Sequence, residues 1–458
     1  MRYISAFLIV MLALPAGAQQ VPQSAAQMQL SFVPLVKEAA PAVVNIYAKI
    51  VRPGRSSPFA GDPFFERFFQ DRRRGLPQLQ NSLGSGVILS ADGIVVSNYH
   101  VVGDATDIRV VLADRREFSA RVLLGDAESD LAILQIDVAT DLPFLPLREA
   151  ETVEVGELAL AIGNPFGVGQ TVSSGIVSGL ARSGTATGSG RGYFIQTDAP
   201  INPGNSGGAL VDIEGRLIGI NTSILTRSGG SNGIGFAIPA DLVAAFVRQA
   251  KAGRTEFERP WAGINGQAVD AGIARALGFD RPGGIVVSGL HPASPFGDVD
   301  VAVGDVITAV NGQPVNTPSE MVYRMSVTGP GRAAQISRVR DGMEATVEVA
   351  LVAAPEVPPR EERRLNAREL LEGMELSRVN PAVIDEFNLP LEAAGVLVSD
   401  PGPLGRRVGL RRGDVIMAMG DVVVTRPGEV ATLFARRAGR YDLIVLRDGR
   451  RINVRFRT

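Results

Sequence analysis

Residues 86–102 read GVILSADGIVVSNYHVV, and residues 209–222 read ALVDIEGRLIGINT. In each stretch two apolar runs flank a short turn that contains a glycine, Gly93 in the first and Gly215 in the second. This pattern is typical of a β-hairpin. Short β-rich segments with similar turns continue from about residue 32 to residue 252. Their number and spacing favour an antiparallel barrel or sandwich for this part of the chain.

The composition excludes several classes of protein. The chain has 458 residues, 45% of them hydrophobic, and a net charge of -2. These values predict two to four soluble domains and disfavour a nucleic-acid partner. There is no cysteine, so disulfides, Cys-based metal sites and a thiol nucleophile are excluded, and we expect neither a metal nor a cofactor. Only two histidines occur, His100 and His291, so imidazole chemistry has few possible positions.

The first 18 residues, MRYISAFLIVMLALPAGA, have the pattern of a signal peptide. An apolar stretch from Ala6 to Leu14 is too short for a bilayer core of about 30 Å, and the A-x-A motif that ends at Ala18 fits signal-peptidase cleavage. We therefore predict that residues 1–18 are removed during export. An uncleaved N-terminal anchor remains the alternative.

The C-terminal half contains an internal repeat. Three motifs occur twice, about 110 residues apart: GGIVV at 283–287 with AGVLV at 394–398, VGDVITAVNG at 303–312 with RGDVIMAMGD at 412–421, and RDGMEATVEV at 340–349 with RDGRRINVRF at 447–456. Units of about ninety residues are large enough to fold as independent domains. The stretch PEVPPREERR between them, at 355–364, has the composition of a stiff, solvated linker.

Two further segments flank the β-rich region. ADLVAAFVRQAK at 240–251 has an acidic residue at its start and Gly253 just after its end, which predicts a helix. PFAGDPFFERFFQDRRRGLPQ at 58–78 mixes Phe, Arg and Pro without strand or helix periodicity. We predict a long loop there whose aromatic side chains dock on another surface, because their free exposure would favour association.

Residues 202–210, NPGNSGGAL, place the hydroxyl of Ser206 in a turn. Taken alone, this stretch fits a plain hairpin turn equally well, because Gly and Asn occur wherever φ is positive. A reactive serine needs a base, usually a histidine that a carboxylate orients. His100 ends a strand-like run, where it could equally serve as an ordinary strand-end residue.

Two aspartates are candidates for the orienting carboxylate. Asp130 opens DLAILQI, which puts its charge at the mouth of an apolar strand, where a charge needs a partner. Asp126 lies in the more polar turn GDAES and is the weaker candidate, with a turn or N-cap role as its alternative. The order His100, Asp130, Ser206 is that of chymotrypsin-like double barrels.

A rival interpretation is the nucleophile elbow of α/β-hydrolases, because Gly204, Ser206 and Gly208 match its G-x-S-x-G pattern. That elbow leads into a helix and requires a histidine after the serine. Here a hairpin follows, and the only later histidine, His291, lies in HPASP inside the repeat region, where we assign it to a turn. The match is accidental.

Taken together, the motifs resemble those of the HtrA family of exported serine endopeptidases, in the DegP/DegQ-like form with two PDZ domains. The motifs that carry this resemblance are SNYHVV, SDLAILQI, AIGNPFG, SSGIVSGLARSG, QTDAPINPGNSGGAL, NGIGFAIP and both repeats. The resemblance implies a mainly β chain, with a chymotrypsin-like double β-barrel protease domain at 30–252. PDZ domains at 259–352 and 365–458, joined by a linker at 353–364, would follow.

By this resemblance His100, Asp130 and Ser206 match the catalytic triad, and the backbone amides of Gly204 and Ser206 match the oxyanion hole. Asn205 stands where trypsin-like enzymes place an Asp that pairs with a newly cut N-terminus, so control by loop rearrangement is expected instead. The resemblance also implies a substrate pocket based at Pro200, with small aliphatic side chains preferred. Its wall and the strand that pairs with substrate would be Thr222, Ser223, Ile224, Leu225 and Thr226. Arg182 matches an arginine that relays activation, with a solvated surface role as the alternative.

The repeats resemble PDZ domains in which an apolar-x-Gly-apolar loop offers amides to a peptide carboxylate while the peptide adds a strand to the sheet. The loop residues would be Trp261, Ala262, Gly263 and Ile264 in the first copy and Leu371, Glu372, Gly373 and Met374 in the second. Trp261 is bulky for its position, so the first groove is expected to be altered. Plain domain packing is the alternative for the second.

The resemblance implies a periplasmic, ATP-independent serine endopeptidase that degrades misfolded or damaged proteins by acyl-enzyme hydrolysis. Its partners would be unfolded polypeptides, membrane proteins among them, and C-terminal peptides bound at the PDZ domains. The expected assembly is a homotrimer or a multiple of trimers. The alternative is a periplasmic holdase or PDZ binding protein whose protease site is latent.

Overall fold

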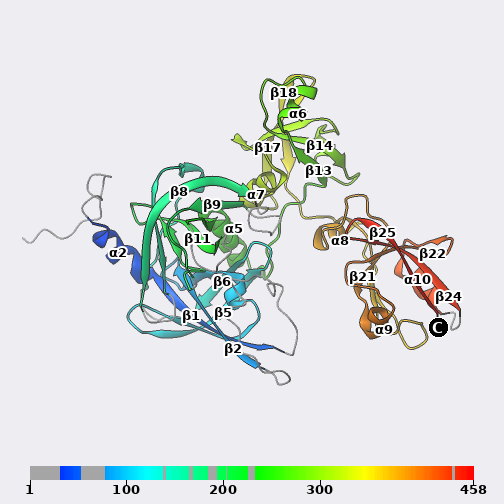
Figure 1. The fold of residues 1–458 in the computed structure, drawn as a ribbon, viewed down its shortest axis with the longest axis horizontal. Coiled ribbons are helices and arrows are strands. Elements are labelled where there is room, and N and C mark those ends of the chain that lie inside the picture. Colours follow the sequence, from blue (N-terminus) through cyan, green and yellow to red (C-terminus); the bar gives the residue numbers. More distant parts are fainter. Residues whose placement is uncertain are drawn as a thin grey trace, which may run out of the picture. The chain divides into compact units, whose positions relative to one another are not determined.

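The computed structural model describes residues 31–52, 78–137, 141–164, 169–183, 193–202, 204–224, 233–435 and 439–457. Figure 1 shows the elements coloured along the sequence. By its internal contacts the chain divides into two compact units. The first consists of Met1–Val122, Asp130–Leu180 and Ile195–Ala240, and the second of Leu123–Ser129, Ala181–Phe194 and Asp241–Thr458. The predicted signal peptide at 1–18 and nearly all of the predicted Phe-rich loop lie outside the described residues.

Two closed β-barrels carry the first part of the chain, which decides between the barrel and the sandwich that the hairpin patterns left open. The first barrel has the strand order β1-β2-β3-β6-β5-β4 and encloses an apolar core that includes Val44, Val95 and Leu134. The hairpin at 86–102 closes at Gly93, whose φ of +88° suits glycine. Its strands are β1 (Val43–Arg52), β2 (Gln78–Ile88), β3 (Ile94–Ser97), β4 (Ala105–Val111), β5 (Glu117–Asp126) and β6 (Leu131–Ile136).

The second barrel has the strand order β10-β11-β12-β9-β8-β7 and its own core. The strands are β7 (Leu158–Gly163), β8 (Thr171–Ser183), β9 (Tyr193–Thr197), β10 (Ala209–Val211), β11 (Leu217–Ile224) and β12 (Gly235–Pro239). In the described part of this region, the α-helix α2 (Val33–Ala39) comes before β1, and the α-helix α4 (Tyr99–Val102) follows β3. Two six-stranded barrels in sequence are the chymotrypsin-like fold that the sequence predicted.

The helix predicted at 240–251 is confirmed as α5 (Ala240–Lys251). After it, a first repeat domain, named here for residues 259–352, has the sheet order β13-β14-β15-β17-β18, with β16 beside β15. Its elements are β13 (Ile264–Ala268), α6 (Ala271–Ala276), β14 (Ile285–Leu290), β15 (Val306–Val310), β16 (Gln313–Pro314), α7 (Pro318–Thr328), β17 (Ala333–Arg340) and β18 (Met343–Ala350). The hydroxyl of Thr317 accepts a hydrogen bond from the amide of Glu320 and so caps α7.

A second repeat domain, named here for residues 363–457, has the order β19-β20-β21-β22-β24-β25, with β23 beside β22. Its elements are β19 (Arg363–Arg364), β20 (Glu375–Arg378), α8 (Pro381–Glu386), β21 (Val396–Asp400), α9 (Gly402–Arg407), β22 (Val415–Met419), β23 (Val422–Val423), α10 (Pro427–Phe434), β24 (Arg440–Arg447) and β25 (Arg450–Arg457). The predicted linker at 353–364 overlaps this domain, because its last two residues, Arg363 and Arg364, form a strand of the sheet.

In each repeat domain an arginine binds a buried aspartate at the same place in the sheet. In the first, Arg340 binds Asp305, with Nε at 2.6 Å from Oδ1 and Nη2 at 2.8 Å from Oδ2. In the second, Arg447 binds Asp414 at 2.7 Å through the same two nitrogens. Burial alone would raise the pKa of Asp305, but the hydrogen bonds from Arg340 and the amide of Ala302, together with the charges of Arg338 and Arg340, hold that pKa below its ordinary value. The pair supports both sheets at matching positions.

None of the described helices is long and apolar enough to cross a membrane.

Candidate active site

His100 and Asp130 lie together at one end of the first barrel. The carboxylate of Asp130 accepts three contacts from His100: ring Nδ1 lies 2.9 Å from Oδ1 and 2.9 Å from Oδ2, and the backbone amide lies 3.0 Å from Oδ1. The side chains are 10% and 19% exposed, respectively. With its Nδ1–H directed to Asp130, a neutral imidazole carries its lone pair on Nε2.

Asp130 is fixed on both its backbone and its side chain. Its φ of +53° lies in the left-handed region, which aspartate tolerates better than most residues. The carbonyl oxygen accepts hydrogen bonds from the amide of Tyr99 at 3.2 Å and from Nδ2 of Asn98 at 2.9 Å. The hydroxyl of Thr222 donates to Oδ2 at 2.6 Å. These contacts leave the carboxylate one orientation, toward His100.

Thr222 connects the acid to the serine. Its hydroxyl holds Asp130, and its carbonyl accepts the hydroxyl proton of Ser206 at 3.1 Å. The pairing of β11 with β12 shifts register between Asn221 and Ser223, so Thr222 sits at an irregularity that turns its side chain away from the regular alternation. We predicted Thr222 only as pocket wall. The alternation of side chains along a regular strand does not predict the contact between Thr222 and Asp130.

The turn around Ser206 is built from glycines in left-handed conformations, with φ of +94° at Gly204 and +82° at Gly207. A Cβ at Gly207 would lie 2.1 Å from the carbonyl oxygen of Ser85, so no larger residue fits there. Among the described residues, the amides of Gly204 and Ser206 have no hydrogen-bond acceptor. Two neighbouring free amides form the kind of cradle that binds an oxyanion.

Ser85, which the sequence analysis did not single out, fastens this turn. Its amide donates to the carbonyl of Ser206 at 2.9 Å, and its hydroxyl donates to the carbonyl of Gly204 at 2.6 Å. The same hydroxyl accepts from the amide of Asn164 at 2.8 Å. Ser85 is fully buried, so these bonds have no competition from water.

The remaining predicted pocket residues are placed as follows. Pro200 is exposed, and its carbonyl accepts the hydroxyl of Ser173 at 2.6 Å. Asn205 is fully buried against Gly163, and its side-chain amide has no partner among the described residues. The backbone of Ser223 and Ile224 pairs with β12. Arg182 lies in β8. Leu225 and Thr226 lie outside the described residues.

Asp126, the weaker acid candidate, is engaged elsewhere. Its carboxylate accepts the amide of Ser129 at 2.6 Å, which is the turn role given as its alternative. It also binds the guanidinium of Arg259, which reaches the hydroxyl of Ser129 at 2.7 Å as well. Burial lowers the pKa of Arg259, but Asp126 and Glu128 outweigh this and raise it overall. Asp126 therefore has a structural partner of its own.

The predicted carboxylate loop of the first repeat domain runs from Trp261 to Ile264. Trp261 is 5% exposed, and its indole packs so closely over Gly263 that a Cβ there would lie 2.7 Å from a ring carbon. The carbonyl of Ala262 accepts the hydroxyl of Ser294 at 2.5 Å. The carbonyl of Gly263 accepts the amide of His291 at 2.8 Å. Trp261 thus forms part of the floor of this loop.

His291 contacts the same loop through its backbone amide and its ring. Its Nδ1 accepts the amide of Ala293 at 3.0 Å, and its ring lies edge-on to Trp261 with centroids 5.3 Å apart. Burial lowers its pKa from the ordinary 6.5, so the folded domain prefers the neutral ring. Its contribution to stability is complete above about pH 6.5 and is lost as the pH falls below that value, because the unfolded chain binds the proton first.

Trp261 is the only tryptophan of the chain, which makes this titration measurable. We expect the native fluorescence of Trp261 to change with an apparent pKa below 6.5 as His291 takes up a proton. The change should vanish in His291→Gln and persist in His100→Gln, which removes the other histidine. A titration that survives His291→Gln would show that another group senses the proton.

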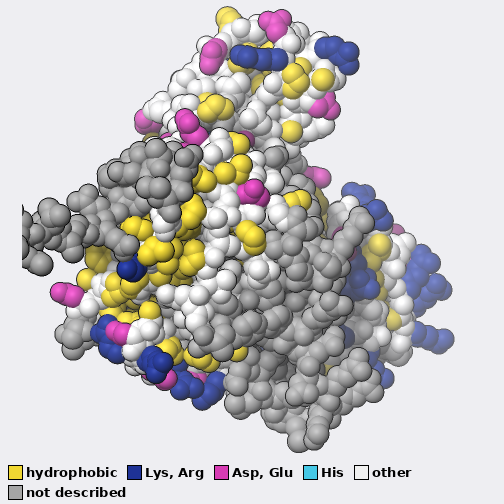
Figure 2. Space-filling model, turned by 60° about the vertical axis from the view of Figure 1, so that its left-hand side comes forward, with side chains coloured by type: hydrophobic (Ala, Val, Ile, Leu, Met, Phe, Trp, Pro, Cys, Tyr) yellow, Lys and Arg dark blue, Asp and Glu magenta, His cyan; other side chains and the backbone are white. Residues whose placement is uncertain are grey.

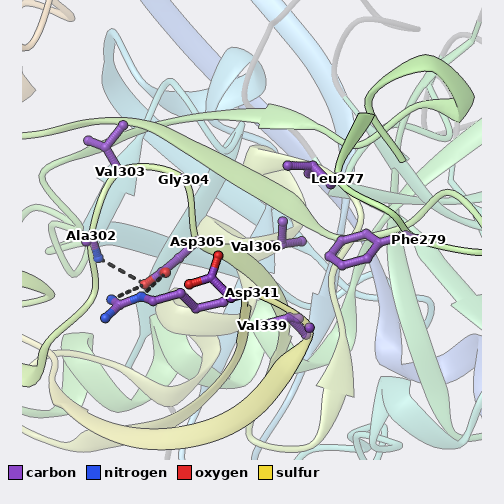
Figure 3. A pocket seen from close by; sticks show the side chains of 11 residues that line it. Leu277, Phe279, Ala302, Val303, Gly304, Asp305, Val306, Val339 and Asp341 are labelled. Atoms are coloured by element: carbon purple, nitrogen blue, oxygen red, sulfur yellow. Dashed lines mark hydrogen bonds and ion pairs between the residues drawn. The ribbon is translucent and has the colours of Figure 1, made fainter. Parts of the chain in front are cut away.

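A pocket of about 420 Å³ lies in the first repeat domain between Leu277, Phe279, Val303 and Val339 (Figure 3). Its polar side is formed by Asp305 and Arg340, which bind each other. Because the second repeat domain has the same ion pair, we interpret this polar side as part of the domain's framework.

The fold and this site define a trypsin-like serine peptidase that carries PDZ domains. A model of the trypsin-like peptidase domain matches residues 84–220, and a PDZ domain model matches residues 259–351. The chain belongs to the HtrA family of serine endoproteases, in its DegP/DegQ-like branch. The predicted family, fold class and enzyme class are thereby confirmed.

Full-length relatives and solved structures carry this assignment. A probable periplasmic serine endoprotease, DegP-like, of Pseudomonas fluorescens is 35% identical over 100% of this chain and 98% of the relative. The periplasmic pH-dependent serine endoprotease DegQ of Escherichia coli is 36% identical over 93% of this chain and 91% of its own. The solved HtrA-type protease AlgW with tripeptide has a TM-score of 0.54 at 38% identity and covers 72% of this chain and 98% of its own.

Proposed function

We propose that this protein is an ATP-independent endopeptidase that degrades misfolded proteins in the periplasm through an acyl-enzyme. The observation that carries this proposal is a series of hydrogen bonds: Asp130 binds both His100 and the hydroxyl of Thr222, and the carbonyl of Thr222 binds the hydroxyl of Ser206. The periplasmic location rests on the names of the relatives and on the predicted signal peptide at 1–18.

In the proposed reaction, Oγ of Ser206 attacks a peptide carbonyl carbon and Nε2 of His100 takes the hydroxyl proton. The negative charge that develops on the carbonyl oxygen is bound by the amides of Gly204 and Ser206. Such a donor typically contributes about 3 kcal/mol. His100 then returns the proton to the leaving amine, and Asp130 keeps its ring in one tautomer throughout. Water, activated by the same base, hydrolyses the ester.

The direct test is incubation of purified protein with unfolded casein in the absence of nucleotide. Cleavage is expected, together with loss of activity after labelling of Ser206 by a fluorophosphonate.

The alternative function, a holdase with a latent protease site, is favoured by the hydroxyl of Ser206 pointing at the carbonyl of Thr222. A serine has one hydroxyl proton, so this bond must break before His100 receives it. Casein that stays intact but no longer aggregates would support the holdase.

Ser85→Ala tests the fastening of the nucleophile turn. Its loss frees the carbonyl of Gly204 and leaves the amide of Asn164 without an acceptor, so the two amides of the oxyanion cradle lose their fixed direction. We expect kcat on a peptide reporter to fall by about 10- to 100-fold with little change in KM. The matched control is Ser97→Ala, because Ser97 is an equally buried hydroxyl, bonded to the carbonyl of Ser85 at 2.7 Å. Equal kcat values for the two variants would contradict this role.

The repeat domains would bind C-terminal peptides and thereby raise the local concentration of a substrate at Ser206. Assembly into trimers is supported by exposed apolar side chains of the first unit, among them Val33, Phe144 and Val155. Figure 2, which brings the side of the molecule with α2 forward, shows hydrophobic side chains exposed on the described part of that face.

A further inference from the structure

The two repeat domains differ at the sheet edge where a peptide would add. In the first, β13 follows the carboxylate loop and forms the edge of the sheet among the described residues. In the second, the corresponding strand β20 is covered by β19. A PDZ ligand adds as a strand at this edge, with its terminal carboxylate on the amides of the loop.

The segment at the covered edge makes the bonds of a peptide ligand. β19 runs antiparallel to β20, with Arg363 opposite Leu376. The amide of Leu365 donates to the carbonyl of Met374 at 2.9 Å, and the carbonyl of Leu365 accepts the amide of Gly373 at 2.9 Å. Leu365 thus stands where the last residue of a bound peptide would stand, with its carbonyl in place of one carboxylate oxygen.

The side chains agree with this placement. Leu365 is 2% exposed and belongs to the core cluster that includes Leu371, Met374, Val430 and Phe434. Because Val430 and Phe434 lie on α10, the leucine belongs to a core to which that helix contributes. Arg363 also reaches α10, since its Nη1 lies 3.9 Å from the position of a Cβ at Gly428.

Glu369 pins the segment in this position. Its carboxylate accepts Nη2 of Arg363 at 2.7 Å and the amide of Asn366 at 2.5 Å, and the residue is 9% exposed. The second amide of the loop is also engaged, because Met374 donates to the carbonyl of Leu371 at 3.1 Å. In the first repeat domain, by contrast, the amide of Gly263, which matches that of Gly373, has no acceptor among the described residues.

We propose that the peptide groove of the second repeat domain is filled by the chain's own Arg363-Arg364-Leu365, and that this domain accepts an external C-terminus only when that segment leaves. The inference rests on the proposed peptide-binding role of the repeat domains. A segment tethered by a loop of a few residues has an effective concentration in the millimolar range or above, so a free peptide of ordinary affinity is excluded.

Hydrogen exchange of the full-length protein, followed by mass spectrometry, tests this proposal. The probe is the hexapeptide REERRL with a free carboxylate, and its C-terminal amide is the control ligand. In the unmodified chain the segment 371–378 should exchange slowly without peptide and should not change when the probe is added. Slower exchange of 371–378 in the presence of the probe would overturn the proposal, because the groove would then be open.

Leu365→Gly should empty the groove. Exchange at 371–378 is expected to rise by at least about tenfold and to fall again when the carboxylate probe, but not its amide, is added. Leu443→Ala is the matched control: it removes a fully buried leucine of the same core from β24 and should not let the probe bind. Failure of the probe to protect 371–378 in a folded Leu365→Gly chain would overturn the proposal.

A second variant decides the case in which Leu365→Gly unfolds the domain. Glu369→Ala leaves the leucine side chain unchanged but removes the acceptor for both Arg363 and Asn366, so the segment should leave the groove more often. We expect faster exchange of the Gly373 amide and renewed protection by the probe, and unchanged exchange would count against the proposal. These outcomes do not depend on casein cleavage, so a failed protease assay and a failed groove assay are distinguishable.

Discussion

Ser206→Ala is expected to abolish casein cleavage while the chain stays folded. The change removes one hydroxyl from a turn whose backbone is held by the amide and hydroxyl of Ser85, and both bonds go to backbone atoms that alanine retains. Loss of the nucleophile from an assembled triad lowers turnover by roughly 10⁴- to 10⁶-fold. Casein cleavage and the thermal unfolding midpoint, measured on the same preparation, check both parts.

The Ser206→Ala result has its own control. Ser97→Ala removes another buried hydroxyl of the first unit and should keep most of the activity, so a general loss of folding would affect both variants. Cleavage by Ser206→Ala at the rate of the unmodified protein would place the nucleophile at another residue. A fluorophosphonate should label the unmodified chain at Ser206 and should leave the variant unlabelled.

The second large effect is expected for Asp130→Asn, with kcat lowered by about 10⁴-fold. An asparagine can still accept a bond from Thr222 through its carbonyl oxygen, but its amide nitrogen opposes Nδ1–H of His100. The ring then loses the tautomer that leaves Nε2 free to take the proton. The pH profile of kcat on a reporter peptide separates this effect from unfolding, since activity should recover partly at high pH.

Asp126→Asn is the matched comparison for Asp130→Asn. Asp126 binds Arg259 and the turn amide of Ser129, so its loss should destabilise the second unit and leave kcat within about threefold of the unmodified value. The opposite ranking, with Asp126→Asn the inactive variant, would mean that the wrong acid was assigned to His100.

The sequence contained most of the fold. Hairpin signals around Gly93 and Gly215 favoured an antiparallel barrel or sandwich, and the helix at 240–251 was recognisable from the acidic residue at its start and Gly253 just after its end. These features depend on neighbouring residues, and local propensity and patterning describe such features well. The apolar strand behind Asp130 also favoured it over Asp126 as the partner of His100, and the structure places the two together.

The contacts that the sequence did not reveal all join distant segments. Thr222 meets Asp130 across 92 positions, and Ser85 meets Gly204 across 119. Neither contact has a local pattern, because each depends on how two strands are brought together by the closed barrels. The Pro-rich, charged composition at 355–364 predicted a solvated linker, and it concealed a strand whose ligand-like role depends on pairing with β20.

The arginine-aspartate pair that recurs in both repeat domains has a consequence for their ancestry. In each copy the aspartate immediately precedes a strand, β15 or β22, and the arginine ends another, β17 or β24. Such agreement in position and geometry is what a duplicated gene segment leaves behind. Both copies retain the arginine-aspartate pair, but they differ at the peptide groove. The sheet edge is open at β13 in the first repeat domain, whereas β19 pairs with β20 in the second. The first repeat domain, whose sheet edge is open, is therefore the copy that we expect to bind an external peptide.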